Sequence, residues 1–81
     1  MAKGVVYGAK KVSVRKAPWD PLNDSVLREK TKGDTIIVDS NRPCYDWKGH
    51  MFYPLIEGGI TSGYIRSDAV KLHATTVVRK V

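Results

Sequence analysis

The chain is poor in cysteine and in long hydrophobic runs. Cys44 is its single cysteine, so no internal disulfide forms, packing alone must stabilise the fold, and the redox compartment stays undetermined. No window approaches the ~18 apolar residues of a membrane helix, and residues 1–7 lack the apolar run of a signal peptide. We therefore expect a chain that is cytoplasmic as synthesised or part of a virion, with no membrane partner.

Metal ligands and catalytic groups are also scarce. Cys44, His50 and His73 are the only thiol or imidazole donors, and they show no paired ligand spacing, which argues against zinc. Cys44 and His50 are close in sequence, but the residues that flank Cys44 indicate a loop rather than a nucleophile beside an oriented base. Gly58-Gly59 lacks the lysine and the following helix of a phosphate loop. The sequence predicts no enzyme, no metal and no cofactor.

What the chain does have is positive charge, unevenly spread. Residues 1–32 hold eight Lys and Arg against three Asp and Glu, which gives +5 of the formal net charge of +6 and leaves +1 for the rest. A basic face of this kind suits nucleic acid, an anionic wall polymer or an acidic protein surface, and it also suits plain solvation. With 81 residues and 42% hydrophobic content, the chain is one small domain with one thin core and no deep cleft.

Turn residues recur every eight to twelve positions, a spacing typical of a small all-β barrel or sandwich. Residues 10–16 predict a half-buried strand with Val12 and Val14 on one face. Residues 4–7 form a short first strand, or continue into residues 10–16 through a bulge at Gly8. Residues 17–24 predict a loop whose Trp19 either covers the core or is presented to a ligand.

The middle of the chain predicts strands separated by tight turns. For residues 25–32 we favour a strand over a two-turn helix, because an isolated short helix is marginal. Gly33 can adopt the positive φ of the turn that follows. Residues 35–39 are the clearest strand, with Ile36 and Val38 on one side and Ile37 on the other.

The second half begins with a predicted loop over residues 40–46. Residues 47–56 form a longer apolar and aromatic segment, in which Pro54 indicates an edge position or a bulge. Residues 57–59 close a hairpin and residues 60–66 return along it. Residues 67–69 predict one helical turn, and residues 70–72 a short last strand.

Five short motifs follow one another along the chain: Val12-Ser13-Val14-Arg15-Lys16-Ala17-Pro18, Val26-Leu27, Lys32-Gly33-Asp34, an aromatic strand, and Gly63-Tyr64-Ile65-Arg66-Ser67. In order and spacing they together resemble the bacterial type of SH3 (Src homology 3) domain. The resemblance implies an all-β fold, a small partly open SH3-like barrel of five to six strands with one short helical turn near the C-terminus and no active site. The barrel would cover residues 1–72, and residues 73–81 would form a tail.

The same resemblance implies recognition of cell-wall peptide through a groove lined by aromatic and polar groups. A role in the core competes for each of these residues, and residues 46–55 admit two registers that leave open which of Trp47, Phe52 and Tyr53 faces the surface. The acidic loop of polyproline-binding relatives is missing. The candidate ligand-binding residues are Trp19, Asp20, Tyr45, Trp47, Tyr53 and Tyr64.

We therefore expect a non-catalytic binding module, an accessory structural protein of a phage or phage-like particle that docks to partner subunits or faces the cell wall. The strand-like residues Thr75, Thr76, Val77 and Val78 would add a strand to a neighbour and so support an oligomer. One alternative is a peptidoglycan-peptide-binding module of a cell-wall system. Another is a small basic barrel that binds nucleic acid through stacking aromatic residues.

Overall fold

The computed structural model describes residues 1–17 and 26–73 of the chain. These residues form one antiparallel sheet of eight strands, and their only helical element is a single 3₁₀ turn. None of the described elements is a helix of the length and apolarity needed to cross a membrane. In chain order the elements are β1 (Ala2–Val6), β2 (Lys11–Arg15), β3 (Val26–Thr31), β4 (Thr35–Val38), β5 (Cys44–Tyr45), β6 (Met51–Glu57), β7 (Ile60–Arg66), η2 (Ser67–Ala69) and β8 (Val70–Leu72).

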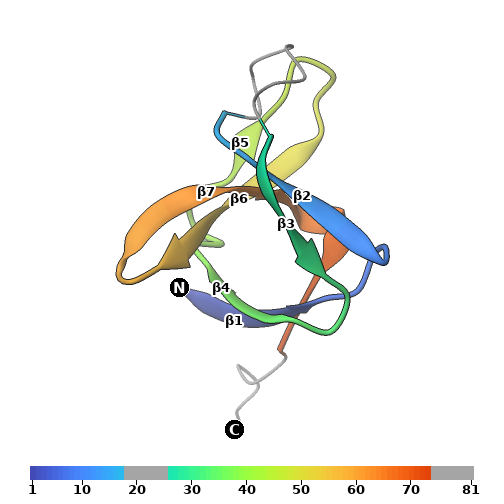
Figure 1. Cartoon of the computed structure of the whole chain (residues 1–81). Coiled ribbons are helices and arrows are strands. Elements are labelled where there is room, and N and C mark those ends of the chain that lie inside the picture. The colour runs from blue at the N-terminus through green and yellow to red at the C-terminus, as the bar shows by residue number, and fades with distance from the viewer. Residues whose placement is uncertain (18–25, 74–81) are drawn as a thin grey trace, which may run out of the picture.

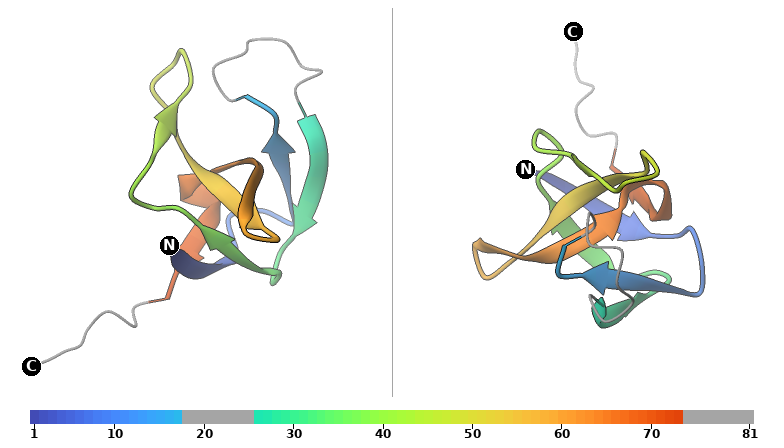
Figure 2. Two further views of the ribbon diagram at one scale, coloured as in Figure 1. Left: turned by 90° about the vertical axis from the view of Figure 1, so that its left-hand side faces the viewer. Right: turned by 90° about the horizontal axis from the view of Figure 1, so that it is seen from above.

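The sheet curls around a common interior without closing (Figure 1). Its strand order is β3-β2-β7-β6-β4-β1-β8, with β5 paired to β6 beside this path. β3 and β8 are the two ends of the path, and the β6–β7 hairpin projects from one side of the molecule (Figure 2). The predicted all-β, partly open fold is confirmed. The sheet has eight strands where the resemblance implies five to six, because β1 and β2 are separate strands and the short β5 and β8 also pair into the sheet.

The separation of β1 from β2 settles one alternative. β1 pairs with β4 and β8, whereas β2 pairs with β3 and β7, so the two strands belong to different parts of the sheet. Gly8 lies between them, where a side-chain carbon would come within 2.6 Å of the Ala69 Cα atom. The amides of Tyr7 and Gly8 both donate to the Ala69 carbonyl, at 3.0 and 3.3 Å. The chain turns here because η2 packs directly against its backbone.

Alternation along the strands builds the core. Val12 and Val14 of β2 are buried, as are Ile36 and Val38 of β4, while Ile37 between them is 42% exposed. This is the two-sided pattern that the sequence predicts for residues 10–16 and 35–39. The remaining members of the core cluster are Val6, Leu55, Ile65, Ala69 and Val70, with Ala2, Tyr53 and Leu72 packed against it.

Residues 26–31 are the predicted strand rather than a helix. β3 pairs with β2 from Lys11↔Thr31 to Arg15↔Val26. Gly33 follows with φ 97°, the left-handed conformation expected of it. The Asp34 amide donates to the Thr31 carbonyl and the Asp34 carboxylate accepts from the Thr31 amide, so this turn is fixed from both sides.

The second half of the chain matches its turn chemistry closely. Glu57 pairs with Ile60, and the two residues between them have φ 63° and 82°, which fits a type I′ hairpin. η2 and β8 cover the residues predicted for the helical turn and last strand. The predicted loop over residues 40–46 is wrong at its end, where β5 pairs Cys44 with Phe52.

Pro54 occupies an interior strand, in a position that tolerates its missing donor. Its carbonyl accepts from the Asp39 amide at 3.0 Å, so its nitrogen faces the same side. On that side β4 has ended at Val38 and β5 has not begun, so the Pro54 nitrogen lies at a local edge of β6. The register shift of the β6–β7 ladder lies on the other side of β6, one residue further on, between Leu55 and Ile56.

Two predicted segments fall largely outside the described residues. The loop over residues 17–24 is described only at residue 17, and the tail over residues 73–81 only at residue 73.

Candidate binding site

A groove of about 340 Å³ lies between β2 and the junction of β7 with η2. Lys11, Ser13 and Arg15 line it from β2, and Arg66 and Asp68 line it from the opposite side. We call this hollow the cationic groove. Its lining also includes Gly8, Ala9, Val12, Phe52 and Ala69.

Strand alternation explains which side chains reach the cationic groove. Val12 and Val14 point into the core, so the odd-numbered residues of β2 point the other way. Phe52 of β6 also borders the groove, but its ring is only 3% exposed and lies outside the main core cluster. A ligand in this groove would therefore meet mainly the charged groups of the rim.

Arg66 is held in place by the turn that follows it. Its Nε and Nη2 atoms donate to the two carboxylate oxygens of Asp68, at 3.0 and 2.7 Å. This fork geometry fixes a guanidinium more firmly than a single contact does. The described lining therefore holds three cationic side chains and one carboxylate, a net positive charge suited to an anionic ligand.

A second group of cations lies on β3 and has a different environment. Lys30 Nζ donates to Glu57 Oε2 at 2.7 Å, and Arg28 donates to Glu57 Oε1 and to the Ser62 hydroxyl. Ser62 also donates to Glu57 Oε1, at 2.8 Å. The hydrogen bond from Lys30, followed by that from Ser62, lowers the pKa of Glu57 to about 2. We call these four residues the ion cluster; they tie the edge strand β3 to the β6–β7 hairpin.

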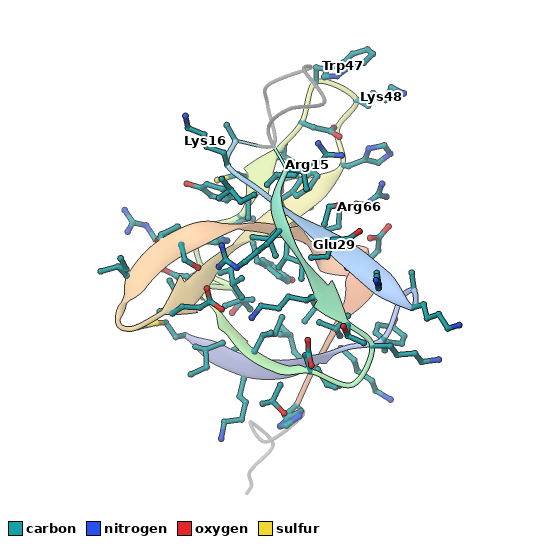
Figure 3. All side chains as sticks on the ribbon, viewed as in Figure 1. Arg15, Lys16, Glu29, Trp47, Lys48 and Arg66 are labelled. Atoms are coloured by element: carbon teal, nitrogen blue, oxygen red, sulfur yellow. The ribbon has the colours of Figure 1, made fainter. Side chains whose placement is uncertain are left out.

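A third feature is the loop between β5 and β6, which carries Trp47. Trp47 is 70% exposed, and the Lys48 ammonium lies 5.0 Å from the centre of its ring, within range of a cation–π contact. Figure 3 shows both residues at the tip of this loop, at the same end of the barrel as Lys16.

Asp46 organises that loop from its base. One carboxylate oxygen accepts from the amides of Lys48 and His50, and the other contacts the His50 ring at 2.9 Å. Partial desolvation raises the pKa of Asp46, but the hydrogen bonds from His50 and Lys48 outweigh it and lower that pKa overall. Gly49 takes φ 87° to complete the turn. Trp47 is thus presented on an ordered scaffold.

The aromatic residues named from the sequence occupy different places. Tyr45 is 54% exposed and Trp47, two positions further on, is also exposed, whereas Tyr53 packs against the core. Tyr64 lines a separate hollow of about 270 Å³ together with Asp39, Arg42, Cys44, Pro54 and Thr61. The structure resolves the open register: Trp47 is at the surface, Phe52 is buried and Tyr53 is half-buried.

None of the described aromatic candidates lines the cationic groove, and the other candidates lie outside the described residues. Trp19 and Asp20 belong to the stretch 18–25, and Thr75, Thr76, Val77 and Val78 to the stretch 74–81.

Sequence reasoning missed the groove residues on both sides. The alternation of β2 and the basic first third of the chain point to Lys11 and Arg15 as an outward cationic row. No local pattern places Arg66 and Asp68 across from that row, because they follow it by about fifty positions.

Metal chemistry has no geometric support in residues 1–17 and 26–73, where no three His, Cys, Asp or Glu side chains gather.

Comparison of the chain with protein-family models, curated proteins and solved structures finds no match. The residues and their geometry therefore carry the functional argument.

Proposed function

We propose that this chain is a non-catalytic binding module that holds an extended, carboxylate-bearing peptide in the cationic groove. The observation that carries the proposal is the rim of Lys11, Arg15 and Arg66 around the groove. These charged groups would steer the ligand and orient it through its carboxylates.

The resemblance to bacterial SH3 domains supports this proposal from the sequence side. It suggests cell-wall peptide, whose free carboxylates suit the groove, as the ligand. The wider setting that we propose is an accessory structural protein of a phage or phage-like particle, on which the barrel docks to partner subunits or faces the wall. Neighbouring genes for tail or capsid proteins would support that setting, and their absence would count against it.

The ligand can be tested by nuclear magnetic resonance titration of the full chain with soluble wall peptide. We expect saturable shifts at the amides of Lys11, Ser13 and Arg66, and weaker binding as ionic strength rises. Lys11→Ala and Arg66→Ala should each weaken binding roughly three- to tenfold, since each removes one charge-assisted contact.

Lys71→Ala is the matched control, because Lys71 is an exposed cation on β8 and does not line the groove. Equal loss of affinity with Lys71→Ala would reduce the effect to general charge. Shifts confined to residues outside the groove would refute the proposal.

A second candidate function, binding of single-stranded nucleic acid, is favoured by one observation. Trp47 presents an exposed ring with the Lys48 ammonium beside it, a combination on which a base can stack next to its phosphate. Trp47→Ala should then lower the affinity for a fluorescent oligothymidine about tenfold. Tyr7→Ala is the control, since Tyr7 is 50% exposed elsewhere on the barrel. Lack of any anisotropy change at low ionic strength would remove this candidate.

A further inference from the structure

A second groove, of about 430 Å³, lies on the outer face of β1, β4 and β6 and is mostly apolar. We call it the apolar groove. It is distinct from the cationic groove, since the two share no lining residue. Its lining residues are Met1, Ala2, Lys3, Ile37, Ile56, Gly58 and Gly59.

The strand register creates this groove. Lys3 pairs with Ile37 and Ile37 pairs with Ile56, so the three side chains form one row across three neighbouring strands. Because Ile36 and Val38 fill the core, Ile37 has to face outward, where it is 42% exposed. Gly58 and Gly59 have the positive φ values of the hairpin turn and add no side chain, which leaves the end of the row hollow.

Exposed apolar side chains also stand at the border of the groove. Ile60, next to Gly59 in sequence, is 68% exposed, and Met1 in the lining is 75% exposed. A contiguous apolar patch on a small domain marks an interaction surface more often than a scatter of single residues does.

The course of the chain after β8 identifies a partner for the patch. β8 runs antiparallel to β1, and the His73 amide donates to the Lys3 carbonyl at 3.0 Å, so the chain leaves the barrel at the Met1 end of β1. The residues that follow are Ala-Thr-Thr-Val-Val-Arg-Lys-Val. Their β-branched composition favours an extended conformation and supplies apolar side chains.

The same eight residues argue against docking within one chain. To reach Ile37 of its own barrel, the segment would have to turn sharply across β1 directly after His73, because His73 bonds to Lys3 and Lys3 pairs with Ile37. It contains no Gly, Pro, Asn, Asp or Ser, the residues that make such turns inexpensive. Eight extended residues span about 26 Å, whereas β1 and β6 are separated by about 10 Å, so the segment is long enough to cross the groove of a neighbour.

We propose that the apolar groove binds residues 74–81 of a second copy of this chain. Each copy offers one groove and one segment, so the contact is head-to-tail, and it continues into a ring or a filament unless the geometry closes it. The proposal is independent of the ligand of the cationic groove.

The test is a mixing experiment followed by sedimentation velocity. The full chain should associate as its concentration rises from micromolar to millimolar. Ile37→Lys destroys the groove but keeps the segment, and deletion of residues 74–81 keeps the groove but removes the segment. Each variant alone should stay monomeric, with association at least about tenfold weaker. Mixed together, the two should form a one-to-one heterodimer that grows no further.

Controls separate this result from misfolding and from other interfaces. Thr35→Lys places the same charge on the outer face of β4 outside the groove and should associate normally. Ile37→Thr keeps a β-branched residue and serves if Ile37→Lys fails to fold. A full chain that stays monomeric, an assembly that survives the deletion, or a mixture that stays monomeric would each overturn the proposal. So would a monomer in which the deletion alone speeds amide exchange at Ile37 and Ile56, since the segment would then dock within its own chain.

Discussion

The cationic groove and the ion cluster both gather basic side chains on one small barrel, but they differ in what neutralises them. In the ion cluster a single carboxylate, Glu57, contacts both Arg28 and Lys30, and its pKa is lowered to about 2. In the cationic groove Asp68 forms an ion pair with Arg66 of the same turn, and the lining keeps a net positive formal charge around a hollow.

This difference suggests how to separate structural charge from binding charge. A cation whose partner carboxylate lies on another strand helps to hold the strands together, and its loss should lower stability. Where a groove is lined by more cations than carboxylates, a cation at its rim should contribute to ligand binding. Loss of that cation should leave stability almost unchanged. Four substitutions test this contrast, from the largest expected effect on stability to the smallest.

Leu55→Ala should abolish both features at once. Leu55 is fully buried in the core beneath the sheet, so its truncation should lower the free energy of unfolding by about 2–5 kcal/mol. A domain of this size has little more than that to lose, and much of the chain should unfold at room temperature. Calorimetry would show the lower unfolding temperature, and a narrow range of amide proton chemical shifts would show the unfolded chain. Ile37→Ala, at a half-exposed position one strand away, should cost well under half as much; equal losses would contradict the assignment of inner and outer faces.

Gly8→Ala should disturb the cationic groove and spare the ion cluster. The added methyl group would come within 2.6 Å of the Ala69 Cα atom, so η2 has to shift away together with Asp68. We expect a loss of about 1–3 kcal/mol in urea unfolding, with chemical-shift changes at Arg66 and Asp68. Lys10→Ala, two residues along at an exposed position, is the control. Unchanged stability with Gly8→Ala would show that η2 does not pack against this backbone.

Glu57→Gln should weaken the ion cluster in a pH-dependent manner. The folded-state pKa of about 2 lies below the ordinary 4.5, so the ionised carboxylate contributes stability above about pH 4.5 that is lost as the pH falls towards 2. Because the side chain is 38% exposed, solvent screens its charge and the expected contribution is about 1 kcal/mol at pH 7.

Urea unfolding from pH 7 to pH 2 would measure this contribution. The curves of the original chain and of Glu57→Gln should converge at the acid end. Glu29→Gln changes an exposed carboxylate on the opposite face of β3 from Arg28 and Lys30, and it should have no comparable effect. A constant difference at every pH would mean that Glu57 acts through packing and not through charge.

Lys11→Ala should have the smallest effect on stability, within about 0.5 kcal/mol, because Lys11 is an exposed side chain at the rim of the groove. Lys30→Ala, on the neighbouring strand, should cost about 1 kcal/mol and leave ligand binding unchanged. Denaturation and binding should be measured for both variants, because together they compare a lysine that stabilises the fold with one that binds the ligand. If both variants lost binding equally, the distinction between the two groups of cations would fail.

Much of the local structure could be predicted from single stretches of sequence. The inward Ile36 and Val38 and the outward Ile37 follow from alternation, and the hairpin at Gly58-Gly59 follows from the residues that tolerate positive φ. The strand over residues 26–31 is harder to predict, since its composition also suits a short helix. β5 has no sequence signal because two residues carry no periodicity, and only their pairing with β6 makes them a strand.

The sequence by itself determined the all-β character of this protein, its turns and the faces of its strands, because these depend on φ preferences and on a period of two residues. Tertiary structure alone decided which charges meet. Arg28 reaches Glu57 across 29 positions of sequence, and Lys11 shares a groove with Arg66, because the sheet curls and brings distant strands together. That curl depends on core packing summed over the whole chain, which no local pattern encodes.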